Sequence, residues 1–181
     1  MKRKIAIIIT AISAIIAIGV GSTLAYFTAT SGPVINTFTV GKVELTLTET
    51  TGERYPMIPG TTIAKNPRVT VKGGSEDCWL FIKVEKDPTL DTYISYHMAD
   101  GWTPLPEHNG VYYRQVPKAD SATVFSLLRD DSISVKNTVD KTVMAAIASP
   151  PKLSFTAYAI QNLGIDTAAL AWSELQASIQ E

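Results

Sequence analysis

Two histidines are the residues best suited to catalysis or metal binding in this 181-residue chain. His97 and His108, together with Asp100 and Glu107, offer a set of side chains that can ligate a metal ion. The zinc motif of metallopeptidases places its histidines one helical turn apart with a glutamate between them, and that pattern is absent. We therefore predict no catalytic residue, no metal and no cofactor. Zinc binding by the two histidines is the alternative.

Other candidates for chemistry are isolated residues. The sequence contains neither a GxSxG nucleophile motif nor a glycine-rich phosphate loop. Asp130 and Asp131 predict a solvated turn before a strand at Ile133, with a weak calcium contact as the alternative. Cys78 is the single cysteine and precedes Trp79 at the start of an apolar strand, so we predict a buried structural thiol. A reactive or intermolecular thiol is the alternative.

The N-terminus has the layout of a signal peptide. Residues 2–4 are basic, and residues 5–20 then carry no charge. Thr23 and Ala25 have the small side chains that a signal peptidase accepts just before its cut, which predicts cleavage before Tyr26. A retained membrane anchor is the alternative, but the apolar run is short against the roughly 20 residues of a bilayer span.

Export decides the compartment and narrows the range of partners. Removing residues 1–25 leaves 13 basic against 17 acidic residues, a net charge of −4, with no basic cluster. Nucleic acid is excluded as a partner because phosphate binding needs concentrated positive charge. We expect a secreted protein of the extracellular matrix or cell surface, which meets the membrane only before cleavage.

Alternating apolar and polar residues predict a mainly β fold. Strands are expected at residues 37–48, 66–71, 78–86, 111–116, 123–128, 133–135 and 152–161. Turn pairs such as Gly73-Gly74 and Asn109-Gly110 separate them, which indicates an antiparallel jelly roll or β-sandwich over residues 37–181. A short helix over residues 122–129 is the alternative for one strand, and residues 87–108 are expected to form a long loop.

Inward-facing positions follow from the same alternation. The side chains predicted to face the core are Val43, Leu45, Leu47, Leu80, Ile82, Val84, Leu153, Phe155, Ala157 and Ala159. Trp79 and Phe81 predict that the first half of their strand is covered on both faces. A C-terminal helix with Asp166 as its N-cap is expected to bury Ile165, Ala168, Trp172, Leu175 and Ile179.

The segment exposed by cleavage, residues 26–36, is uncharged and partly apolar. Tyr26, Phe27, Val34 and Ile35 require burial, and the segment can obtain it by pairing with an exposed sheet edge. That edge belongs either to its own sheet or to the next subunit, where a head-to-tail contact that does not close builds a filament. A frayed terminal tail is the third reading of this segment.

The order of these motifs resembles the TasA/camelysin family of secreted proteins from Gram-positive bacteria, which a dedicated SipW-type signal peptidase processes. The resemblance rests on the runs GSTLAYFT at residues 21–28, NTFTVG at 36–41 and VELTL at 43–47. Residues 59–60, 66–71, 78–85 and 155–161 continue the family's order, whereas residues 87–151 do not align specifically.

This resemblance implies a jelly-roll domain that assembles with itself into biofilm-matrix fibres. It assigns residues 26–36 to the strand donated to an adjacent subunit, with Phe38 and Val40 anchoring that segment to its own domain. Camelysin-like relatives are also described as surface metallopeptidases, but this chain lacks their zinc motif. The expected function is therefore a secreted structural protein that polymerises by strand donation. A zinc peptidase and a monomeric cell-surface binding module are the alternatives.

Overall fold

The computed structural model of the protein describes residues 42–52, 55, 57–140, 143, 147 and 151–179. The chain divides into two compact units, Met1–Thr39 and Val40–Glu181, and the described residues belong to the second. The second unit is mainly β, with antiparallel sheets and a C-terminal helix, as the sequence predicts.

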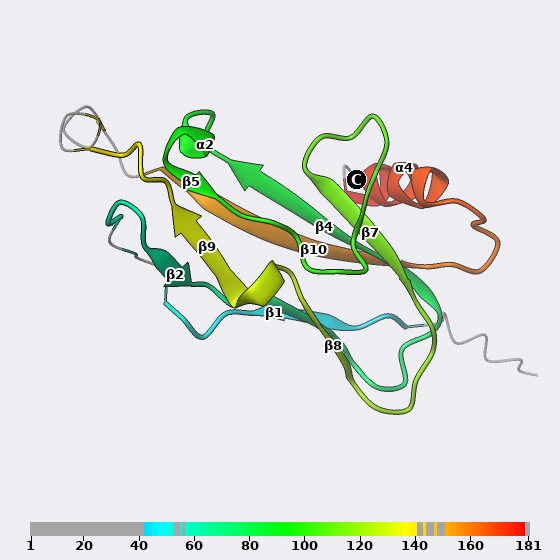
Figure 1. Ribbon diagram of the computed structural model, residues 1–181. Helices are drawn as coiled ribbons and strands as arrows, with labels where there is room; N and C mark the ends of the chain where they lie inside the picture. The colour runs from blue at the N-terminus through cyan, green and yellow to red at the C-terminus, as the bar shows by residue number, and fades with distance from the viewer. Residues whose placement is uncertain are drawn as a thin grey trace, which may run out of the picture. The chain divides into compact units, whose positions relative to one another are not determined.

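Ten strands form three antiparallel sheets in the described residues (Figure 1). The first sheet has the order β1 (Leu45–Thr48), β3 (Arg68–Val71), β8 (Thr123–Ser126). The second has the order β10 (Leu153–Gln161), β4 (Cys78–Lys86), β7 (Val111–Val116), β6 (Thr103–Pro104). The third has the order β2 (Thr62–Ala64), β9 (Ser132–Val135), β5 (Ile94–Ser95). The helical elements are α2 (Leu90–Tyr93), a 3-10 turn at Arg129–Asp131 and α4 (Ala168–Ile179).

The main core lies between the first and second sheets. Val69 of β3 and Leu80 and Ile82 of β4 are fully buried there, because alternate residues of each strand point towards the facing sheet. The predicted inward residues of β1 and β10 pack against the same core. This face-to-face packing is the sandwich that the alternation predicts.

Helix α4 covers the other face of the second sheet. Trp79 and Phe81 alternate with the core residues of β4 and point towards the helix, where the ring of Phe81 lies 5.1 Å from that of Trp172. The indole N–H of Trp79 donates to the carbonyl of Ile165 at 3.0 Å, which fixes the segment that leads into the helix. The prediction that the first half of β4 is covered on both faces is confirmed, since the residues from Cys78 to Ile82 are all buried.

The ends of α4 differ from the sequence prediction. Thr167, not Asp166, caps the helix, since its hydroxyl accepts the backbone N–H of Leu170 at 3.2 Å. Ile165 is partly buried, but Ile179 is 54% exposed because it closes the helix and no further turn covers it. The buried stripe is instead completed by Ala171.

Three further segments also differ from the predictions. The alternative helix over residues 122–129 is wrong, because Phe125 pairs with Val69 of β3 in a strand and packs, partly buried, against the main core. Residues 87–108 are not only a loop, since they contain α2, β5 and β6 and bury Trp102 and Leu105. Of the expected strand 37–48, the described residues show Leu45–Thr48, and residues 37–41 lie outside the described residues.

We predict that α4 stabilises the fold through its buried stripe alone. Leu175 is 5% exposed and Leu170, in the same helix, is 46% exposed. Leu175→Ala should lower the free energy of unfolding by roughly 2–5 kcal/mol, because it leaves a cavity against the second sheet. Leu170→Ala is the matched control and should change it by less than about 0.5 kcal/mol. Denaturant unfolding measures both, and equal effects would contradict this packing.

We also predict that the thiol of Cys78 is inert in the folded protein. Cys78 is fully buried, and burial, aided by the negative charge of Asp77, raises its pKa to about 11. Since the thiolate is the reactive form, a disulfide reagent at a pH near 8 should label the native chain far more slowly than the unfolded chain. Equal labelling rates in buffer and in guanidinium chloride would contradict the prediction.

Candidate functional site

One side of the sandwich ends in two strands that are each paired on one edge only in the described part of the chain. β1 is the end strand of the first sheet and β10 is the end strand of the second, and the two lie in contact (Figure 1). Within the described residues, no further strand pairs with the outer edge of either one. We call this region the open side; its residues are Val43, which precedes β1, Leu45 and Leu47 of β1, and Leu153, Phe155, Ala157 and Ala159 of β10.

Among the described residues, no strand pairs with the outer edge of β10 at any point along its length. The N–H of Asp87 donates to the carbonyl of Lys152, and the N–H of Asn162 donates to that of Asp77, each at 3.0 Å. These two bonds show that the even-numbered residues of β10 direct their backbone N–H and C=O groups at β4. The odd-numbered residues therefore direct their N–H and C=O groups away from β4, towards the open side. A second strand can satisfy this row of donors and acceptors.

β1 offers a shorter edge of the same kind. The N–H of Lys72 donates to the carbonyl of Glu44 at 2.8 Å, so the backbone groups of Glu44, Thr46 and Thr48 face β3. Leu45 and Leu47 consequently turn their backbone groups outward. Because β1 has four residues and β10 has nine, β10 is the more extensive edge.

The side chains along the open side are apolar and incompletely covered. All seven of its residues pack against the main core, yet each is only partly buried. Each of these residues thus combines a side chain that faces the core with backbone groups that face outward. A strand added here would satisfy the backbone and complete the burial at once.

The opposite side of the sandwich is closed. The indole N–H of Trp102 donates to the carbonyl of Ser126 on β8 at 2.9 Å. The guanidinium of Arg114 lies 4.0 Å from the ring centre of Phe125 and 5.1 Å from that of Trp102. These contacts fill the gap between β8 and the second sheet, so the two sides of the sandwich are not equivalent.

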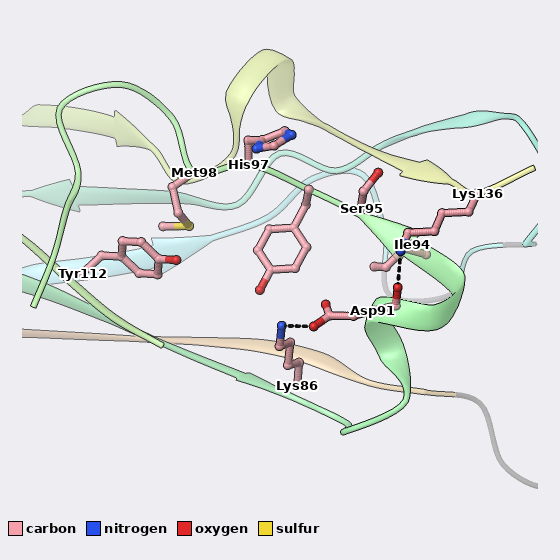
Figure 2. A pocket seen from close by; sticks show the side chains of 9 residues that line it. Lys86, Asp91, Ile94, Ser95, His97, Met98, Tyr112 and Lys136 are labelled. Carbon is pink, nitrogen blue, oxygen red and sulfur yellow. Dashed lines mark hydrogen bonds and ion pairs between the residues drawn. The ribbon is translucent and has the colours of Figure 1, made fainter. Parts of the chain in front are cut away.

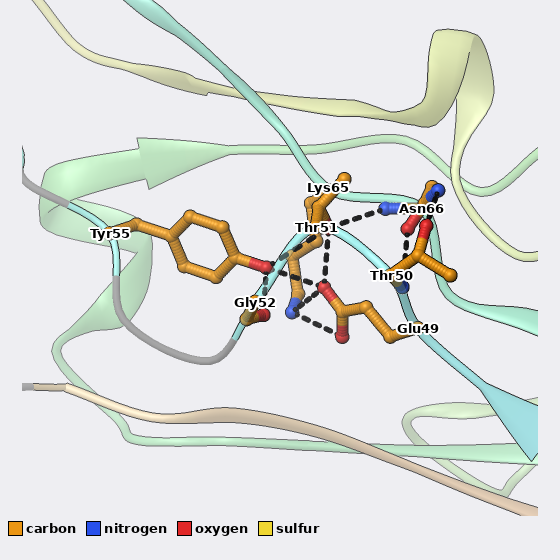
Figure 3. A network of polar contacts seen from close by, with 7 residues as sticks. All are labelled: Glu49, Thr50, Thr51, Gly52, Tyr55, Lys65 and Asn66. Carbon is orange, nitrogen blue, oxygen red and sulfur yellow. Dashed lines mark hydrogen bonds and ion pairs between the residues drawn. The ribbon is translucent and has the colours of Figure 1, made fainter.

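A polar network marks one end of the open side (Figure 3). Glu49 follows β1 directly, and both of its carboxylate oxygens lie 2.9 Å from the Nζ of Lys65. The side chain of Lys65 is only 8% exposed, and its Nζ also lies 5.9 Å from the ring centre of Phe155 on β10. The hydroxyl of Tyr55 donates to Glu49 at 2.6 Å. A strand added to the open side would therefore meet the charged Glu49–Lys65 pair at this end.

This network holds Glu49 in its ionised form. Burial by itself raises the pKa of Glu49, but the hydrogen bonds from Tyr55, Lys65 and Thr51 and the positive charge of Lys65 outweigh it. The pKa of Glu49 is therefore lowered overall. At neutral pH the buried ammonium of Lys65 keeps a charged partner, as a buried cation requires.

The residues predicted to act in cleavage and strand donation lie outside the described residues. These are Thr23, Ala25, Tyr26, Phe27, Val34, Ile35 and Phe38, together with the anchor Val40. The structure instead describes the edge that such a segment can pair with. The sequence predicts the inward faces of β1 and β10, but it carries no signal that these are end strands, because strand order depends on contacts between distant segments.

The two histidines are not brought together. His97 is exposed, and its carbonyl accepts the N–H of Arg129 at 2.9 Å. His108 is also exposed, and its ring lies 6.3 Å from that of Trp172 on the α4 side of the second sheet. Across the described ranges, no group of three or more His, Cys, Asp or Glu side chains is placed to hold a metal ion.

The turn at Asp130 and Asp131 is confirmed. Both residues have positive φ angles, 55° and 46°, in the 3-10 turn before β9. Asp131 accepts a hydrogen bond from the guanidinium of Arg68 at 2.6 Å, so it links β3 to this turn.

Comparisons with models of known protein families, with curated proteins and with solved structures find no match to this chain. In the described part of the chain, no helix has the length and apolar character needed to cross a membrane. The resemblance to the TasA/camelysin family stays a prediction from the sequence.

Proposed function

We propose that this protein is a secreted structural protein that polymerises head to tail by strand addition. After cleavage of residues 1–25 by a signal peptidase, residues 26–36 of one copy add to the open side of the next copy. The sandwich is proposed to be of the jelly-roll type, and the product to be an extracellular matrix fibre. The observation that supports this function is the open side itself, an unpaired edge above an incompletely covered core.

The segment and the edge agree in length. Residues 26–36 span about 36 Å when extended, and the nine residues of β10 span about 30 Å. The four residues of β1 span only about 13 Å, so β10 is the proposed pairing partner. β1 then contributes the opposite wall of the site.

The side-chain pattern of the segment also suits this edge. In an extended segment, Phe27, Ala29, Ser31, Pro33 and Ile35 share one face, which is the more apolar of the two. We assign this face to the gap in the core. Tyr26 and Val34 then lie on the outer face.

Pro33 favours one direction for the added strand. The inward residues of β10 direct their backbone groups at the new strand. In antiparallel pairing, the residues of the new strand whose side chains point inward must direct their backbone N–H and C=O groups at β10. Pro33 is one of these residues, and it has no N–H to donate. In parallel pairing the outward residues make the hydrogen bonds instead, and Pro33 faces away from β10. We therefore propose parallel addition.

Deleting the donor segment should abolish assembly. A chain that begins at Tyr26 should form fibres that electron microscopy detects, whereas a chain that begins at Thr37 should stay monomeric, because the open side then lacks its strand. A peptide of residues 26–36 should bind the shortened chain and raise its unfolding temperature, and a scrambled peptide should not. Fibres from the shortened chain would refute strand donation. Monomers from the longer chain at all concentrations would also refute strand donation between copies.

Proline substitutions in β10 separate the outer edge from the inner one. The N–H of Ala157 points to the open side, so Ala157→Pro should block assembly while the fold persists. The matched control is Thr156→Pro, which removes an N–H that faces β4 and should cost roughly 1–3 kcal/mol of folding stability. Electron microscopy measures fibre assembly, and denaturant unfolding measures folding stability. Normal fibres from a folded Ala157→Pro chain would exclude β10 as the acceptor.

A further inference from the structure

A second site lies where the end of β4 meets α2, β5 and β7. It is a cavity of about 370 Å³, a volume in the range of small-molecule sites. It shares no residue with the open side, and the inference drawn from it does not depend on strand donation.

The charges around this cavity leave an excess of positive groups. Figure 2 shows Lys86 and Lys136 both reaching Asp91, Lys86 at the carboxylate and Lys136 at the main-chain carbonyl. Asp91 is the single acidic residue that lines the cavity, and its carboxylate is already paired with Lys86. Among the described residues no carboxylate pairs with Lys136. An ammonium group is therefore left for an incoming anion.

The remaining walls combine rings with hydroxyl groups. Tyr96 and Tyr112 are both partly buried against the main core, which restricts the positions of their rings. The Nζ of Lys86 lies 6.0 Å from the ring centre of Tyr96, so a cation and an aromatic face border the same space. Ser95 adds a further hydroxyl and Met98 an apolar surface. Hydroxyls and flat rings suit a ligand that is polar at its rim and carries C–H groups on its face.

We propose that this cavity binds a hexuronic acid, a six-carbon sugar that carries a carboxylate. The ammonium groups of Lys136 and Lys86 take the carboxylate, and the sugar ring lies against the tyrosine rings with its hydroxyls towards Ser95 and the phenol groups. A neutral sugar would leave Lys136 without an anion. A simple carboxylate such as acetate would leave the rings and the remaining volume unused.

Calorimetric titration of the full chain with glucuronate tests the site, with glucose and acetate as the two partial ligands. Glucuronate should bind at least about tenfold more tightly than either, since each partial ligand lacks one set of contacts. Lys136→Gln should weaken glucuronate binding by about tenfold or more, and Lys136→Arg should retain most of it. Lys118→Gln removes the same charge far from the cavity, where Lys118 pairs with Glu76, and should leave binding unchanged.

Three results would overturn the proposal. They are the absence of glucuronate binding at millimolar concentration, equal binding by Lys136→Gln and the parent chain, and equal affinity for acetate and glucuronate. Thermal unfolding of each variant shows whether it is folded, and the comparison of glucuronate with glucose and acetate on the parent chain keeps the test decisive if Lys136→Gln unfolds.

Discussion

Burial of the first half of β4 on both faces is the constraint on which the rest of the structure depends. Its even-numbered residues Leu80 and Ile82 fill the main core, and Trp79 and Phe81 fill the space beneath α4. A strand buried in this way needs hydrogen-bonded neighbours on both edges, because unpaired backbone groups in a dry interior cost free energy. β10 and β7 supply those neighbours over nearly the full length of β4.

This central position of β4 leaves β10 as an end strand. The even-numbered residues of β10 direct their backbone groups at β4. Their side chains, which include Tyr158 and Ile160, pack on the α4 side of the sheet. The odd-numbered residues of β10 direct their side chains into the main core and their backbone groups outward. The open side is thus the part of the sandwich that β4 and α4 cannot complete. The opposite side avoids this outcome because Trp102 and Arg114 bridge the sheets there.

The sequence predicts those parts of the fold that depend on local pattern. The bounds of β4 and β7 match the prediction, since each is a run rich in apolar, β-branched and aromatic residues with turn residues beside it. It does not predict the cap of α4, because Asp166 and Thr167 are both good capping residues and the choice depends on where the chain leaves the sheet. Likewise it misses the Glu49–Lys65 pair, whose partners meet only after β1 and β2 are placed. The candidate site follows from strand order, which no local pattern encodes.

The shape of the open side restricts what can occupy it. Its acceptor groups form one straight row and its uncovered side chains lie just inside that row, so only an extended chain can use both. Such a chain must also present apolar residues at every second position, and it must end or turn polar at the Glu49–Lys65 pair. Residues 26–36 are uncharged, and four of the five side chains on one face of the extended segment are apolar. In the proposed fibre, therefore, the edge itself selects its strand, since a charged or helical segment would leave either the backbone or the core unsatisfied.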